Sequence, residues 1–255
     1  MSTAFEPEEL AIPQPLAPAV LVVGTGGGAG ATTTAWGLAA AIGATTDWDA
    51  VAVDASTSGG DLGLRGADEL MRPMSLQAWL TEIGDGATSV TRELLLSSSI
   101  GAGLLWQDDT ALPPRATIGT TARLLRMSGY LGIYDGGGHV SAQQLLPLIC
   151  DGHTGLIVTA PARRGAANRL FTSLKWLDHN LGVDVVADTT VVVTHQDRRT
   201  ESIADEIRRS LSGWVRDVFE VPYDPHLVGG VALSVDQLHS STTTAYADIV
   251  MGVGL

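Results

Sequence analysis

The strongest constraint on this chain lies near its beginning, where an apolar run, a glycine-rich turn and a segment of small residues follow one another directly. Residues 20–23 are apolar, five glycines fall between Gly24 and Gly30, and a hydroxyl pair follows at Thr32 and Thr33. This order is typical of a buried strand that turns sharply into a helix. The backbone N–H groups of such a turn and of the helix N-terminus can bind an anion.

The turn lacks the lysine that nucleotide-hydrolysing loops of this shape place just before the hydroxyl pair. That position is Ala31, and the one lysine of the chain, Lys175, lies far downstream. A lysine in this place reaches the β and γ phosphates and stabilises the charge that develops in phosphoryl transfer. The turn can therefore bind an anion, but it has lost its main electrostatic contribution to catalysis.

Apolar segments alternate with amphipathic segments along the rest of the chain. Strands are predicted at residues 20–23, 50–53, 131–134, 156–159, 190–194 and 218–221. Helices are predicted at residues 33–42, 76–82, 121–127, 167–181 and 201–215. The alternation indicates a single-domain α/β fold with a mostly parallel, doubly wound sheet. Ligands of such sheets bind at the carboxyl ends of the strands, where this sequence collects its glycines and aspartates.

Composition limits the partners that the chain can have. The formal net charge is −13, and no cluster of Lys and Arg is present to neutralise phosphates, so we expect no binding to nucleic acid. No run of about 18 apolar residues occurs, so we expect a cytoplasmic protein without direct membrane insertion. A single cysteine, Cys150, excludes an internal disulfide. Residues 1–18 predict a disordered acidic leader, and residues 19–255 predict the folded domain.

The glycine turn has two other interpretations. Gly24-x-Gly26-x-x-Ala29 matches the dinucleotide-binding fingerprint, and Asp54 closes the second strand where an acid would bind a ribose hydroxyl. Two observations argue against this interpretation. The turn continues into the hydroxyl pair, and the chain has no Tyr-x-x-x-Lys pair because Phe171 stands four residues before Lys175, where the tyrosine would be. The turn could also be purely structural. Both alternatives remain beside the phosphate-loop hypothesis.

The segment Gly26-Gly-Gly-Ala-Gly-Ala-Thr-Thr33 resembles the loop Lys-Gly-Gly-x-Gly-Lys-Thr-Thr of the MinD/ParA superfamily of deviant Walker A ATPases. Both lysines of that loop are replaced, the first by Gly26 and the second by Ala31. Loss of the second lysine to a small residue is common in the CpaE/TadZ group of pilus-assembly and septum-site or pole-localisation proteins. The chain is most similar to that group.

Two further segments resemble the metal-side motifs of the superfamily. Asp54 and Gly60-Asp61 match the CpaE-type stretch that follows the second strand. Ser56 stands where the superfamily has the acid that positions the attacking water. Asp135 resembles the strand-end aspartate that holds Mg²⁺ through water, although glycines at residues 136–138 replace the usual prolines.

Later segments resemble the side of the family site that faces the nucleotide base. Val221-Pro-Tyr-Asp-Pro225 resembles the late base-side loop. His195-Gln-Asp197 falls where the family often has an asparagine that reads adenine. Residues 156–161 resemble the strand that precedes a helix with a regulatory or dimer role.

The resemblance implies a site for ATP or ADP with Mg²⁺, bound weakly or not at all. It assigns no catalytic residue. The implied nucleotide-binding residues are Gly26, Gly27, Gly28, Ala29, Gly30, Ala31, Thr32, Thr33, Pro222, Tyr223 and Asp224. The implied metal residues are Thr32, Asp54 and Asp135. Arg163, Arg164 and Arg198 are the candidates to replace the missing positive charge.

These observations favour a non-catalytic or very slow nucleotide-binding scaffold with a degenerate Walker A loop. The resemblance implies that such a protein recruits a membrane-associated pilus, secretion or division machine through protein partners, with homodimerisation left open. Two alternatives remain. The first is an active ParA/MinD-type partitioning ATPase, and the second is a pseudo-ATPase interaction module that binds no nucleotide.

Overall fold

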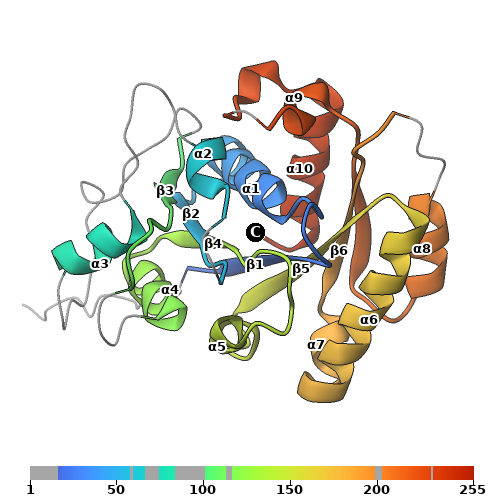
Figure 1. Cartoon of the computed structure of the whole chain (residues 1–255), viewed down its shortest axis with the longest axis horizontal. Helices are drawn as coiled ribbons and strands as arrows, with labels where there is room; N and C mark the ends of the chain where they lie inside the picture. Colours follow the sequence, from blue (N-terminus) through green and yellow to red (C-terminus); the bar gives the residue numbers. More distant parts are fainter. Residues whose placement is uncertain are drawn as a thin grey trace, which may run out of the picture.

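The computed structural model describes residues 17–57, 60–66, 75–83, 101–112, 117–198, 203–230 and 232–255. Within these ranges one parallel sheet has the strand order β3-β2-β4-β1-β5-β6-β7 (Figure 1). The strands are β1 (Ala19–Gly24), β2 (Ala50–Asp54), β3 (Gly103–Leu105), β4 (Leu131–Asp135), β5 (Thr154–Pro161), β6 (Thr190–Thr194) and β7 (Asp217–Val221). The predicted α/β class with a parallel sheet is confirmed.

The central strands are apolar on both faces because helices cover both faces. Every residue of β1, β2, β4 and β6 is buried. In β1, Val20 and Val22 join one apolar core, whereas Leu21 and Val23 join the other. Continuous runs of valine, alanine and leucine are the expected pattern for parallel strands buried in this way.

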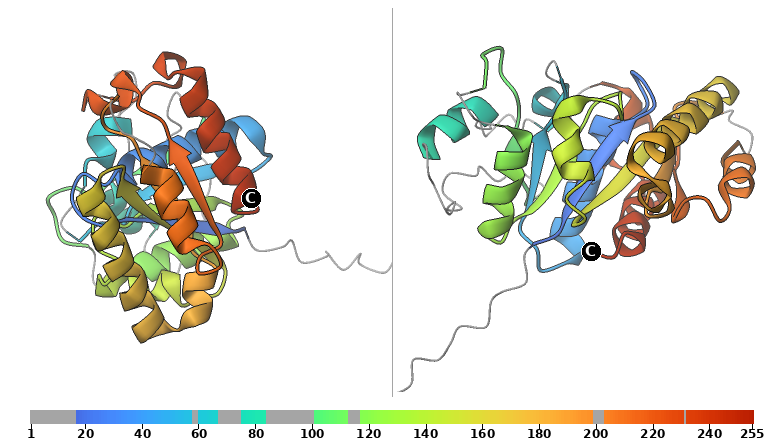
Figure 2. Two further views of the ribbon diagram at one scale, coloured as in Figure 1. Left: turned by 90° about the vertical axis from the view of Figure 1, so that its right-hand side faces the viewer. Right: turned by 90° about the horizontal axis from the view of Figure 1, so that it is seen from below.

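The helices form two layers. One layer contains α1 (Ala31–Thr45), α2 (Leu62–Gly66) and α10 (Ser240–Gly252). The other contains α3 (Leu76–Ile83), α4 (Ile118–Met127), α5 (Leu146–Ile149), α6 (Arg164–Leu181), α7 (Val183–Ala187) and α8 (Ile203–Leu211). Figure 1 shows the two layers on opposite sides of the sheet, and the right-hand view of Figure 2 shows α4, α5 and α6 in front of the strands.

Three short elements lie in the connections. They are the 3-10 helix η2 (Gln143–Leu145), the helix α9 (Pro225–Val228) and the 3-10 helix η3 (Val235–Gln237). In the described part of the chain, no helix has the length and apolar character needed to cross a membrane.

Most predicted elements are present, with longer bounds than predicted. The prediction missed β3, which has three residues, and α10, whose first half is rich in serine and threonine. It also missed the short helices α2, α5, α7 and α9. The helix predicted at residues 201–215 ends at Leu211, and residues 201 and 202 lie outside the described ranges. Residues 1–16 of the predicted leader also lie outside them, whereas Ala17 is buried. The domain boundary at residue 18 stays a prediction.

Candidate functional site

The glycine turn between β1 and α1 has the backbone of an anion-binding loop. Gly26, Gly28 and Gly30 have φ angles of 153°, 71° and 86°, in a region that favours glycine. No side chain caps the N-terminus of α1, and its first turn contains no acidic residue. The first N–H groups of a helix have no partner within the helix, so those at Ala31 and Thr32 are available to an anion.

Three neighbouring strands hold the turn in place. Gly24 N donates to Gly137 O over 2.7 Å after β4, and Thr25 N donates to Thr159 O over 2.9 Å in β5. The Thr194 hydroxyl of β6 donates to Ala29 O over 3.1 Å. The turn is therefore fixed by the carboxyl ends of β4, β5 and β6.

The three glycines that replace the expected prolines allow the β4 loop to lie directly against the turn. A Cβ on Gly138 would be 2.9 Å from the carbonyl carbon of Gly26 and 3.1 Å from Gly27 N. Gly137 has a φ of 71°. Since both neighbours of Gly138 are backbone atoms, only glycine fits there without a shift of the turn.

The position of the missing lysine faces the protein interior. Ala31 is 7% exposed and packs in the core beneath α1. Lys175 lies on α6, eleven residues after Arg164 begins that helix, which is roughly 16 Å along the axis. Neither Gly26 nor Ala31 brings a positive charge to the turn. Thr33, in the first turn of α1, accepts a hydrogen bond at its carbonyl from the Tyr246 hydroxyl over 3.4 Å.

Two aspartates predicted as metal ligands meet beside the turn. Asp54 and Asp135 are partners in the register of β2 and β4, and both are fully buried. Oδ1 of Asp54 accepts from Ser56 N over 3.0 Å and from the Ser56 hydroxyl over 2.7 Å, and Oδ2 accepts from Gly60 N over 2.7 Å. A Cβ on Gly60 would lie 3.4 Å from Asp54 Oδ2 and 3.5 Å from Asp135 Oδ2, so both oxygens face the same small space.

Asp135 is the less satisfied of the two. Its Oδ1 accepts from Gly137 N over 3.0 Å, whereas its buried Oδ2 has no hydrogen-bond partner. Burial raises the pKa of Asp135 to about 6, against lowering effects of the nearby Thr32 hydroxyl and the Gly137 N–H. The negative charges of Asp54 and Asp61 raise this pKa further. A cation in this space would offset the repulsion between the carboxylates and would give the unpaired Oδ2 of Asp135 a partner.

The residues present fit Mg²⁺. This ion takes oxygen ligands, commonly one or two carboxylates completed by waters and substrate phosphates. Among the described residues, no group of three or more His, Cys, Asp and Glu side chains is placed to hold a metal. Asp54, Asp135 and the Thr32 hydroxyl would therefore need phosphate oxygens or water to complete the shell. The metal assignment stays a prediction.

Ser56 stands at the expected place of the water-positioning acid. Its hydroxyl donates to Asp54, so it is neutral and already engaged. Gln107, which no sequence pattern indicated, donates from Nε2 to Asp54 O over 3.1 Å and to Ser56 O over 2.9 Å. Gln107 follows β3, and the failure to predict β3 explains why this residue was missed. It fixes the segment that contains Asp54 and Ser56.

The loop predicted to face a nucleotide base follows β7 and is ordered by Asp224. This buried carboxylate accepts hydrogen bonds from His226 N over 3.0 Å, from His239 N over 2.9 Å and from the Thr242 hydroxyl over 2.8 Å. Burial by itself would raise the pKa of Asp224, but these hydrogen bonds outweigh it and hold the pKa below its ordinary value. Asp224 therefore joins the loop to α9 and to the start of α10.

Pro222 and Tyr223 precede that anchor and are partly exposed. The guanidinium carbon of Arg198 lies 5.4 Å from the centre of the Tyr223 ring. Arg198, one of the arginines predicted to replace the missing charge, is thus stacked on the Tyr223 ring. Whether these residues contact a base stays a prediction.

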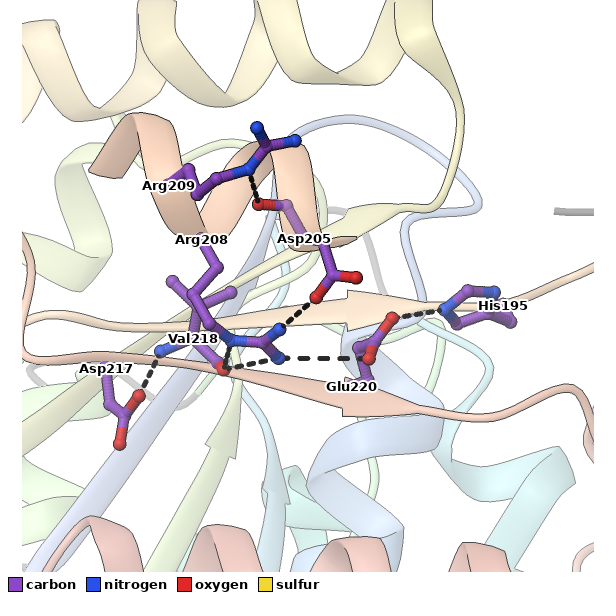
Figure 3. Close-up of polar contacts among 7 residues, drawn as sticks. All are labelled: His195, Asp205, Arg208, Arg209, Asp217, Val218 and Glu220. Atoms are coloured by element: carbon purple, nitrogen blue, oxygen red, sulfur yellow. Dashed lines mark hydrogen bonds and ion pairs between the residues drawn. The ribbon is translucent and has the colours of Figure 1, made fainter. Parts of the chain in front are cut away.

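A network of hydrogen bonds and ion pairs connects β6, β7 and α8 (Figure 3). His195 Nε2 lies 3.1 Å from Glu220 Oε1, and Arg208 Nη2 lies 3.8 Å from Glu220 Oε2. The Arg208 guanidinium also pairs with Asp205 over 2.7 Å and donates to Val218 O. His195 is therefore a structural residue that ties β6 to β7 and α8.

The residue after His195 reaches the glycine turn. Gln196 donates from Nε2 to Gly28 O, and its Oε1 accepts from Arg163 Nη2 over 3.1 Å. Arg163 is thereby held one side chain away from the turn. Arg164 is exposed at the first residue of α6.

Neither a protein-family model nor a curated protein matches the sequence. Solved structures do match. A ParA family ATPase from Chlorobium tepidum TLS aligns with a TM-score of 0.70 and 17% identity, over 92% of this chain and 98% of that one. MinD in the MinC:MinD cell division complex of Aquifex aeolicus aligns with a TM-score of 0.63 and 15% identity, over 94% and 98%.

A third match has a ligand. Cobyrinic acid a,c-diamide synthase from Mycobacterium smegmatis, with bound ATP analogue and magnesium, aligns with a TM-score of 0.54 and 17% identity, over 92% of this chain and 93% of that one. Identities this low show a shared fold. This chain has the α/β fold of the MinD and ParA ATPases.

Proposed function

We propose that this protein is a nucleotide-binding scaffold that holds ATP or ADP with Mg²⁺ and hydrolyses ATP very slowly or not at all. The observation that supports this most is the buried pair of Asp54 and Asp135, with an unpaired carboxylate oxygen, beside an uncapped helix N-terminus. A metal and a phosphate chain would satisfy both features at once.

Binding in this proposal depends on backbone groups and oxygen ligands. The glycine turn and the first turn of α1 supply N–H groups to the phosphates, and Thr32 supplies a hydroxyl on the metal side. Since the strands are parallel, the glycine turn after β1, the aspartates that end β2 and β4 and the Tyr223 loop after β7 lie along the same edge of the sheet, which supports a shared site. When bound, Mg²⁺ would screen the phosphate charge against the two carboxylates.

The same site lacks the charged groups that phosphoryl transfer needs. Ala31 is buried and neutral, Ser56 is engaged with Asp54, and Gly26 has no side chain. Removing one electrostatic stabiliser from an active site costs on the order of 10²–10³ in rate. Three neutral positions therefore make efficient hydrolysis implausible while leaving binding intact.

The resemblance to CpaE/TadZ proteins supports a role in localisation. The chain would be a cytoplasmic protein that is recruited to the membrane or a cell pole by protein partners, and that recruits a pilus, secretion or division machine in turn. One fold neighbour, MinD of Aquifex aeolicus, was solved in complex with MinC. A homodimer is compatible with this role.

Thermal unfolding with and without Mg-ATP tests the proposal, because a ligand that binds the native state raises the melting temperature. The native protein should respond to Mg-ATP, and less so when Mg²⁺ is chelated. Thr32→Val keeps the side-chain shape, removes the hydroxyl and should abolish most of the response. Thr45→Val is the matched control, since Thr45 is exposed at the far end of α1.

Two outcomes would favour the alternatives. No response of the native protein to nucleotide would favour an interaction module that binds none. Phosphate release of order 1 per second or faster would favour an active partitioning ATPase. Ala31→Lys alone should leave hydrolysis near background, because Ser56 would still be neutral.

A further inference from the structure

An arginine lies against the position where the superfamily loop has its first lysine. A Cβ on Gly26 would be 3.6 Å from Nε and 3.9 Å from Cδ of Arg169, on α6. Gly26 has no side chain, so the Arg169 side chain borders the glycine turn directly. The sequence prediction considered Arg163, Arg164 and Arg198 and did not include Arg169.

Arg169 is available to a ligand. Its side chain is exposed, and it forms no ion pair with an acidic residue in the described part of the chain. By contrast, Arg163 is bonded to Gln196, and Arg198 lies over Tyr223. Arg163, Arg169 and Arg198 therefore differ. Only the Arg169 side chain borders the turn and has no hydrogen-bond or ion-pair partner among the described residues of the chain.

The chemistry of the guanidinium suits this place. An arginine side chain donates two parallel hydrogen bonds to phosphate oxygens and stays charged at all physiological pH values. The turn and α1 supply only partial positive charge, from N–H groups and the helix dipole. A polyphosphate bound there has several negative charges, and the nearby Asp54 and Asp135 add more.

We propose that Arg169 binds the phosphates of the nucleotide and replaces the charge lost at Gly26 and Ala31. This inference rests on the proposed nucleotide-binding function and names the residue that makes binding possible without a lysine. Because Arg169 comes from α6 rather than from the turn itself, nucleotide binding would also join α6 to the turn.

Calorimetric titration of Mg-ATP and of adenosine tests the inference on the full-length protein. Arg169→Gln should weaken Mg-ATP binding by about 10-fold, the effect of one partly exposed charged contact to phosphate. Adenosine binding should not change, because adenosine has no phosphate. Lys175→Gln is the matched control, since it removes one exposed positive charge from the same helix further from the turn. It should keep native ATP affinity.

The outcomes separate the two proposals. If the native protein binds Mg-ATP and Arg169→Gln binds it as tightly as Lys175→Gln does, the inference is wrong and the proposed function stands. If the native protein binds no Mg-ATP, both are wrong. An equal loss of ATP and adenosine affinity would also overturn the inference, because it would indicate a structural role. If Arg169→Gln lowers the melting temperature, Arg169→Met, which keeps the apolar stem, provides the same comparison.

Discussion

At the scale of single residues, the buried carboxylate of Asp135 connects stability to metal binding. Its native pKa of about 6 lies above the ordinary value of 3.8, so the native state holds a proton more tightly than the unfolded chain does. The contribution of Asp135 to the free energy of unfolding is therefore most favourable below pH 4 and is lost as the pH rises through 6. A shift of about two pKa units corresponds to about 3 kcal/mol at neutral pH.

Asp135→Asn should stabilise the metal-free protein, because the amide keeps the shape and removes the buried charge. Denaturant unfolding should show a gain of up to about 3 kcal/mol at pH 8 that shrinks as the pH falls below 6. Mg²⁺-dependent stabilisation by ATP should disappear in the same variant. Asp61→Asn, which removes an exposed carboxylate whose charge also raises the pKa of Asp135, should give a much smaller gain in the same direction. A loss of stability at pH 8, or a gain that does not depend on pH, would contradict the account.

Gly138 tests the contact between the β4 loop and the glycine turn. Gly138→Ala should lower the free energy of unfolding by about 1–3 kcal/mol, because its Cβ would overlap the backbone of Gly26. Nucleotide affinity should fall with it. Gly165→Ala is the control, since a Cβ at that helical position meets no atom within 4 Å. Equal stability of the two variants would show that the loop does not press on the turn.

Site residues that belong to a local sequence pattern could be predicted from the sequence. The patterns are glycines between a strand and a helix and aspartates at the ends of apolar runs, and the structure brings Thr32, Asp54 and Asp135 close together. Gln107 and Arg169 could not be predicted, because their roles depend on which distant segment lies beside them.

At the scale of elements, the close approach of α1 and α10 determines how one layer packs. A Cβ on Gly37 would lie 2.3 Å from Cζ of the buried Tyr246 ring. Gly37→Ala should therefore destabilise the protein by about 3 kcal/mol, at the upper end of the usual cost of overpacking. Gly43→Ala, at an exposed position of the same helix, should instead stabilise it by about 0.5–1 kcal/mol. Chemical denaturation measures both, and a stable Gly37→Ala would show that Tyr246 does not lie there.

The elements that the sequence predicts well are those with strong local patterns. The runs of valine and alanine in β1, β2 and β6 strongly predict buried strands. By contrast, β3 is short and is defined by its pairing with β2, and α10 begins with serine and threonine residues that favour helices only weakly. Its helical state depends on packing against α1 and β7.

At the scale of the whole molecule, the net charge of −13 predicts that the protein does not bind DNA or anionic lipid. In a mobility-shift assay at physiological salt, it should not bind non-specific DNA, because the chain is strongly acidic and its sequence has no run of Lys and Arg to displace counterions. Arg208, which stands next to Arg209 in the sequence, is already paired with Asp205 and Glu220. Liposomes of anionic lipid should likewise not pull it down. Micromolar DNA binding that weakens steeply with salt would favour the partitioning ATPase.

The proposed site holds nucleotide without turning it over. Equilibrium dialysis against Mg-ATP, followed by acid release and chromatography of the bound fraction, measures both properties in one sample. We expect the protein to retain nucleotide, the retained nucleotide to remain ATP, and free phosphate to stay near background. Absence of retained nucleotide, or conversion of ATP to ADP at about 1 per second or faster, would contradict it.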